Sequence, residues 1–188
     1  MRFNGEDLNM NIKQLIEFLR RAREESGYEI IGEAKETVLQ DGMRIIGPYT
    51  NGSLTYIDRY EGFEQFHGRE AITLDDGLIW KRDYGGGITD NKYKEKTLAL
   101  ELFDVLKVAL RMFPKDRPFR RGSFPLKIND RYFYSDHCKG DMTSFRGKEK
   151  IFCNFKEIYS LEYNGGVSTY TLDNICILNY NKSFIFWL

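Results

Sequence analysis

Two stretches of this 188-residue chain share one pattern of glycines, aromatic residues and carboxylates. The first is YIDRYEGFEQFHGREAI (56–72), and the second is YSDHCKGDMTSFRGKEKI (134–151). Both read Tyr-x-Asp, then Gly, then Phe-x-Gly-x-Glu-x-Ile, and the second has one extra residue in the loop after Gly140. A pattern that occurs twice constrains the fold more than a single motif does. We therefore interpret the chain as an internal duplication.

The match continues into a third segment of each copy, where an aromatic residue, a tyrosine and two glycines recur. Three positions match at an offset of 78 residues and eight at an offset of 79. The matched pairs are Tyr56/Tyr134, Asp58/Asp136, Gly62/Gly140, Phe66/Phe145, Gly68/Gly147, Glu70/Glu149, Ile72/Ile151, Trp80/Tyr159, Tyr84/Tyr163, Gly86/Gly165 and Gly87/Gly166. So many matches in one order are not expected by chance.

Each copy has the pattern of three antiparallel strands preceded by a helix. Alternating segments are joined by turn signals such as Asp-Gly, which is typical of a hairpin. Apolar residues at helical spacing predict helices in NIKQLIEFLRRAREES (11–26) and TLALELFDVLKVALRMF (97–113). The two helices align at an offset of 87 residues, 15–22 against 102–109. A further hairpin is expected around QDG (40–42).

These elements predict an α+β fold in which two helix-plus-antiparallel-meander units share one compact core. We expect a single domain over 1–188, with a first half at about 9–90 and a second half at about 91–170. The apolar ending predicts a strand pair at 171–188. The glycine runs YGGG (84–87) and YNGG (163–166) are expected to form turns, since neither has the spacing of a phosphate-binding loop.

A carboxylate lies on the otherwise apolar face of the middle strand in both copies. Side chains alternate along a strand, so Glu70 shares its face with Phe66 and Ile72. A charge on a core-facing surface needs a partner, because burial of an unpaired charge is costly. Arg82 could pair with Glu70, but Leu161, at the corresponding position, cannot pair with Glu149.

Three interpretations of the repeated carboxylates remain open. They could accept hydrogen bonds from tyrosine hydroxyls or backbone amides and so fix the strands. They could orient a small ligand in an aromatic-floored cleft between the two units, or hold a divalent cation such as Mg²⁺ or Mn²⁺ for hydrolysis. The candidate ligand-binding residues are Tyr56, Asp58, Glu70, Trp80, Tyr84, Tyr134, Asp136, Glu149 and Tyr163.

Composition gives few further indications of function. The 28 Lys and Arg residues balance the 28 Asp and Glu residues, so net charge does not favour nucleic acid as a partner. We expect no signal peptide and no membrane span, and cytoplasmic localisation is the default. Three cysteines without a CxxC motif do not predict a metal site or a disulfide framework. No cofactor can be assigned, and the C-terminal SFIFWL could mediate self-association.

The chain resembles a bacterial and archaeal domain of unknown function. The resemblance rests on FLRRA, GSLTYIDRYEG, GLIWKRDYGGG, PFRRG, RYFYSD, SFRGKEKIF and YSLEYNGG, over roughly residues 15–168. Such domains occur alone and behind helix-turn-helix regions of transcriptional regulators. The resemblance implies a module that acts as a sensor or an oligomerisation unit, and it implies no particular reaction. Because no helix-turn-helix segment is evident, we do not expect this chain alone to bind nucleic acid.

Overall fold

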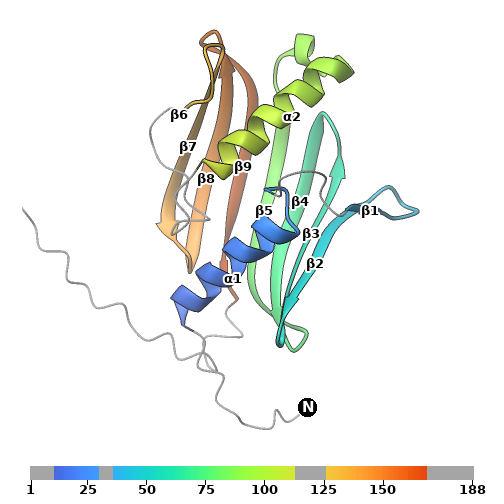
Figure 1. Ribbon diagram of the computed structural model, residues 1–188, viewed down its shortest axis with the longest axis vertical. Coiled ribbons are helices and arrows are strands. Elements are labelled where there is room, and N and C mark those ends of the chain that lie inside the picture. Colours follow the sequence, from blue (N-terminus) through green and yellow to red (C-terminus); the bar gives the residue numbers. More distant parts are fainter. Residues whose placement is uncertain (1–10, 30–35, 113–125, 169–188) are drawn as a thin grey trace, which may run out of the picture.

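The computed structural model describes residues 11–29, 36–112 and 126–168. Within them, one nine-stranded antiparallel sheet carries two long helices on the same face (Figure 1). The elements are α1 (Ile12–Glu25), β1 (Glu36–Val38), β2 (Arg44–Asn51), β3 (Leu54–Gly62), β4 (Gln65–Leu74), β5 (Gly77–Ile88), η1 (Asn91–Lys94), α2 (Lys96–Arg111), β6 (Leu126–Lys127), β7 (Tyr132–Asp141), β8 (Ser144–Cys153) and β9 (Lys156–Val167). The α+β fold class expected from the sequence is therefore confirmed.

The sheet consists of two meanders that meet in the middle. Its strand order is β1-β2-β3-β4-β5-β9-β8-β7-β6, so each meander is formed by strands that follow one another in the chain. β5 pairs with β9, and Tyr84 lies opposite Tyr163 at this junction. We call β2–β5 the first meander and β7–β9 the second. Pairing of β1 with β2 confirms the hairpin expected around QDG.

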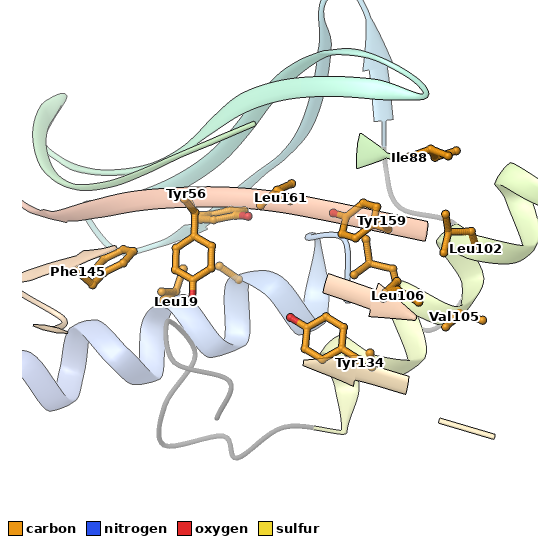
Figure 2. Packing of buried hydrophobic residues seen from close by; sticks show 14 of the residues in the cluster. Leu19, Tyr56, Ile88, Leu102, Val105, Leu106, Tyr134, Phe145, Tyr159 and Leu161 are labelled. Carbon is orange, nitrogen blue, oxygen red and sulfur yellow. The ribbon is translucent and has the colours of Figure 1, made fainter. Parts of the chain in front are cut away.

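Both helices bury one apolar face against the sheet, as their residue spacing predicts. Asn11 caps α1: its side chain accepts a hydrogen bond from the amide of Gln14, and the Gln14 side chain accepts one from the amide of Asn11. Figure 2 shows Leu19 and Leu106 of the helices in the same buried layer as Tyr56 and Tyr159 of the strands. This layer between helices and sheet is the core of the protein.

The two meanders have matching strand registers. Asp58 lies opposite Glu70 in the first, as Asp136 lies opposite Glu149 in the second. An irregularity of register follows Ile72 in the first meander and Ile151 in the second. The next turns also agree, because both have two residues with positive φ: Asp75 and Asp76, and then Asn154 and Phe155. These are the two-residue turns that suit the twist of a hairpin.

The prediction of turns at YGGG and YNGG is wrong. Gly85–Gly87 lie within β5, and Gly165 and Gly166 lie within β9. A Cβ atom at Gly86 would lie 2.2 Å from the carbonyl oxygen of Ser160 on the neighbouring strand. Glycine is needed there because its φ of +149° would direct a Cβ at the nearby backbone of the neighbouring strand, not because the chain reverses.

Some expectations lie outside the described residues. These include the strand pair at 171–188 with its SFIFWL segment. Within the part of the chain that the structure describes, no helix is long and apolar enough to cross a membrane.

Candidate ligand-binding site

Four carboxylates lie buried on the helix-covered face of the sheet. Asp58, Glu70, Asp136 and Glu149 are 6%, 5%, 1% and 3% exposed, respectively. A carboxylate that is desolvated to this extent requires hydrogen bonds or a cation to compensate. What each one contacts decides whether the inner face can form a site.

Each of these carboxylates accepts a hydrogen bond from a tyrosine hydroxyl, in the same arrangement in both meanders. In the first meander, Tyr84 donates to Asp58 (2.7 Å) and Tyr56 donates to Glu70 (3.0 Å). The second meander repeats this with Tyr163 donating to Asp136 (2.7 Å) and Tyr134 to Glu149 (2.7 Å). The repeated tyrosines and carboxylates therefore join β3, β4 and β5 in the first meander and β7, β8 and β9 in the second.

A glycine in the middle strand makes one of these hydrogen bonds possible. Tyr84 on β5 reaches Asp58 on β3 by lying across β4 at Gly68. A Cβ atom at Gly68 would lie 2.5 Å from the hydroxyl oxygen of Tyr84. At Gly147 a Cβ atom would lie 2.3 Å from the ring of Tyr163. The Phe-x-Gly-x-Glu pattern therefore needs glycine so that a tyrosine ring can lie over the strand.

Glu70 has two arginine partners. Arg23, near the end of α1, donates to Oε1 (2.8 Å) and Oε2 (2.5 Å) of Glu70, and Arg82 lies 3.4 Å from Oε2. Burial acts to raise the pKa of Glu70, but the charges of Arg23 and Arg82 and the hydrogen bonds from Arg23 outweigh burial and lower the pKa to about 2. Glu70 is thus a buried anion held by guanidinium groups.

Asp58 is in the opposite electrostatic situation. Its carboxylate forms no ion pair with any basic side chain among the described residues. Burial, followed by the neighbouring charge of Glu70, raises the pKa of Asp58 to about 7, against the lowering effect of the Tyr84 hydrogen bond. Asp58 can therefore exchange a proton near neutral pH.

Glu149 also lacks an ion pair within the described part of the chain. Its Oε1 accepts a second hydrogen bond, from the hydroxyl of Tyr159 (3.0 Å). Arg82 lies near enough for the charge of Glu149 to raise the pKa of that guanidinium, although burial and then the charge of Glu70 have the larger effects on it. The guanidinium of Arg82 lies over the ring of Tyr163, 4.5 Å from its centroid.

A cavity of about 470 Å³ opens beside these carboxylates, between α2, the end of α1 and the sheet. Asp58, Glu70 and Glu149 all line it. An aromatic cluster, which we call the Phe66 cluster, forms part of the wall. The centroid of the Phe66 ring lies 6.2 Å from that of Tyr84, 6.1 Å from that of Phe103 and 6.4 Å from that of Tyr159. This volume lies in the range of cavities that bind small organic molecules.

The cavity contains some of the predicted site residues and not others. Asp58, Glu70, Tyr84 and Glu149 line it. Tyr56, Trp80, Tyr134, Asp136 and Tyr163 are buried on the same face but do not line it. The indole nitrogen of Trp80 is buried and has no hydrogen-bond partner among the described residues. The cavity lies under α2, mainly over the first meander, and it extends to β8 and β9. It is therefore not placed symmetrically between the two meanders.

Sequence reasoning did not identify Arg23, Phe103 or Tyr159 as site residues. Arg23 and Phe103 lie on helices, where spacing shows which face is buried but not which strand lies beneath. Tyr159 was recognised only as the counterpart of Trp80. Arg23 did carry a signal, since this charged residue lies four positions after Leu19 and eight after Leu15, on the apolar side of α1.

The structure shows no further centre of chemistry in the residues that it describes. No group of three or more His, Cys, Asp or Glu side chains among them is arranged to hold a metal ion. Cys138 and Cys153 are not in a disulfide within the described residues, and Cys176 lies outside the described ranges. His67 lies on the surface, with its Nε2 atom 2.8 Å from Oε1 of Glu61.

Comparison with known proteins gives a family and no activity. The family model described as "Domain of unknown function (DUF5680)" matches residues 58–168. No curated protein and no solved structure matches the chain. The matched region begins at Asp58 and ends just after β9, so it contains all four buried carboxylates and leaves out α1. Because the match covers more than half of the sequence, the chain belongs to the DUF5680 family, a domain of unknown function.

Proposed function

We propose that this protein binds a small organic molecule in the cavity under α2 and thereby acts as a sensing or interaction module. Ligand sites are concave, largely apolar and aromatic, with a few fixed polar groups that orient the ligand. The cavity combines these properties, because the Phe66 cluster adjoins the buried carboxylates of Asp58 and Glu149. This adjacency is the observation that carries the proposal.

The polar groups of the cavity are held in place before any ligand arrives. Tyr84 fixes Asp58, and Tyr134 and Tyr159 fix Glu149 from two sides. Groups that are already ordered lose little entropy when a ligand binds, which favours affinity. These contacts support a binding site rather than a surface that forms only on contact with a partner.

A cavity-blocking variant tests the proposal. Leu100 lies on the cavity wall and is 49% exposed, so Leu100→Trp places a large ring at the cavity without displacing the core. The matched control is Met112→Trp, because Met112 is similarly exposed on the end of the same helix and does not line the cavity. A small-molecule library is screened by thermal unfolding against wild type and both variants. Compounds that stabilise wild type and Met112→Trp but not Leu100→Trp are expected, and their absence contradicts the proposal.

We also propose that the two halves arose by duplication of one helix-plus-meander unit. The matching registers and hairpin turns and the repeated tyrosine–carboxylate hydrogen bonds support this origin. In this interpretation Asp136 and Tyr163 are structural, since they keep the shared hydrogen bond and do not line the cavity. A metal-assisted hydrolase is less well supported, because both oxygens of Glu70 are bound by Arg23. Self-association through SFIFWL remains a proposal about residues outside the described ranges.

A further inference from the structure

We infer that the ligand is a small organic cation whose ammonium or guanidinium group binds Glu149 and whose apolar part lies against the Phe66 cluster. The inference rests on the proposed ligand-binding function and specifies the chemical class of the ligand. It is drawn from a comparison of Glu149 with Glu70, which occupy matching positions in the two meanders.

Glu70 shows which partner a carboxylate at this position takes. Both glutamates accept a tyrosine hydrogen bond, face the helices and are almost completely buried. Glu70 in addition receives hydrogen bonds from the guanidinium of Arg23 on both of its oxygens. Such bidentate pairing is the strongest interaction available to a buried carboxylate.

The corresponding positions around Glu149 carry leucines. When the helices are aligned at their offset of 87 residues, Arg23 corresponds to Leu110. The strand position of Arg82 corresponds to Leu161. Leu110, Leu161 and Glu149 all line the cavity. Where the first half has a guanidinium, the second half therefore has an apolar wall, an open volume and a buried carboxylate.

The position of Tyr159 connects the carboxylate to the aromatic cluster. Its hydroxyl donates to Glu149 (3.0 Å), and its ring centroid lies 6.4 Å from that of Phe66. A cation bound to Glu149 would therefore lie beside an aromatic ring, and cation–π attraction would add to the ion pair. An apolar or aromatic group attached to that cation can continue along Phe66 and Phe103.

The charge of the cavity favours a positive ligand. The buried carboxylates of Glu70 and Glu149 face the guanidinium groups of Arg23 and Arg82, and Asp58, whose pKa is raised to about 7, adds part of a further negative charge. Among the described residues of the lining, six are acidic and four are basic. Glu36 and Arg44 at the rim pair with each other (3.1 Å), and the ammonium of Lys107 lies over the ring of Tyr28. A monovalent cation would reduce the excess of negative charge.

Three probes with one phenyl group test the class of ligand: 2-phenylethylammonium, 2-phenylethanol and 3-phenylpropanoate. Each is titrated into the full chain by ligand-observed NMR at low salt. We expect the cation to bind at least about tenfold more tightly than the neutral alcohol, as a buried charged hydrogen bond and a cation–π contact imply, and the anion to bind most weakly. Equal or tighter binding of the alcohol or the anion would overturn the inference.

Two variants locate the charged group. Leu110→Arg places a guanidinium at the position that corresponds to Arg23, so it should compete for Glu149 and weaken cation binding by about tenfold or more. Met112→Arg adds the same charge to the end of the same helix but outside the cavity, and it should leave the affinity nearly unchanged. Glu149→Gln should also weaken binding of the cation, and more than it weakens binding of the neutral alcohol. If it does not fold, Leu110→Arg decides alone, and full retention of cation binding there overturns the inference.

The outcomes separate this inference from the proposed function. Binding of the neutral probe that is blocked by Leu100→Trp, without preference for the cation, overturns the cationic class and leaves ligand binding standing. If none of the three probes binds at millimolar concentration, while Leu100→Trp still blocks the binding of library compounds, the cationic class is likewise overturned and ligand binding stands. Failure of every compound to respond to Leu100→Trp contradicts the proposed function itself.

Discussion

Glu70 and Glu149 lie at matching places in two matching meanders, yet their surroundings differ. Both line the cavity and accept a tyrosine hydroxyl, but Glu70 also binds Arg23, whereas Glu149 accepts a second tyrosine hydroxyl. The hydrogen bonds that join the strands therefore recur in both halves, while the charge partner differs. The comparison teaches that structural need accounts for the recurring tyrosines, and the ligand site that we propose lies where the two halves differ.

The largest expected effect comes from removal of the cation on Glu70. Arg23→Leu leaves the buried carboxylate of Glu70 with the hydrogen bond from Tyr56 and only the longer ion pair to Arg82, and we expect the free energy of unfolding to fall by about 3–5 kcal/mol. Urea unfolding monitored by tryptophan fluorescence measures the change. The control is Arg21→Met, because Arg21 pairs with Glu17 on an exposed surface and its loss should change the stability little.

The next prediction uses the opposite pKa shifts of two neighbouring carboxylates. The pKa of Asp58 is raised from 3.8 to about 7, so the folded protein binds more protons than the unfolded chain between these values, and stability falls as pH rises from 4 to 7. Asp58→Asn removes this loss and should be more stable than wild type at pH 8, by on the order of 4 kcal/mol, and similar to it at pH 4.

Glu70→Gln should show the reverse dependence on pH. The pKa of Glu70 is lowered from 4.5 to about 2, so ionised Glu70 contributes stability above pH 4.5 that is lost as pH falls toward 2. The variant should be less stable than wild type at pH 7 and approach it at low pH. Chemical unfolding at several pH values measures both profiles, and parallel profiles for the two variants would contradict the assignment of charges.

A smaller effect is expected at the glycines beneath the tyrosine rings. Gly147→Ala would force Tyr163 away from Asp136, and the Cβ added by Gly68→Ala would press on both the hydroxyl of Tyr84 and the backbone oxygen of Arg59, so each variant is expected to lose about 1–3 kcal/mol of stability. Gly85→Ala is the control within β5, because its Cβ would meet only an ordinary contact 3.5 Å away. Near-equal melting temperatures for all three alanine variants would show that the rings do not need the glycines.

Much of the fold can be predicted from the sequence, because its signals are local. Helical spacing located α1 and α2, and alternation with turn residues located the strands of both meanders. The glycine runs were misassigned because a close approach of two backbones, as at Gly86 and Ser160, has no signature within one segment. The buried carboxylates could be predicted because side chains alternate between the two faces of a strand, which places Glu70 on the same face as apolar residues.

The cavity could not be predicted in the same way. Its wall combines the middle strands with residues of α1 and α2, such as Arg23 and Phe103, and the sequence does not show which helix crosses which strands. The exchange of Arg82 for Leu161 was visible in the aligned copies. What this exchange means for the site depended on knowing that Leu110, Leu161 and Glu149 line one cavity, which only the packed structure reveals.

The most direct test of the account is a double-mutant cycle between Leu110→Arg and Glu149→Gln, measured by urea unfolding without ligand. If Glu149 takes its cation from a ligand, a guanidinium on α2 should couple to Glu149 with an interaction energy of at least about 1 kcal/mol. Leu110→Arg should then destabilise the protein less when residue 149 is glutamate than when it is glutamine. Met112→Arg should show no coupling in the same cycle. Equal effects of Leu110→Arg in both backgrounds would contradict the account, because the position would then not correspond to Arg23.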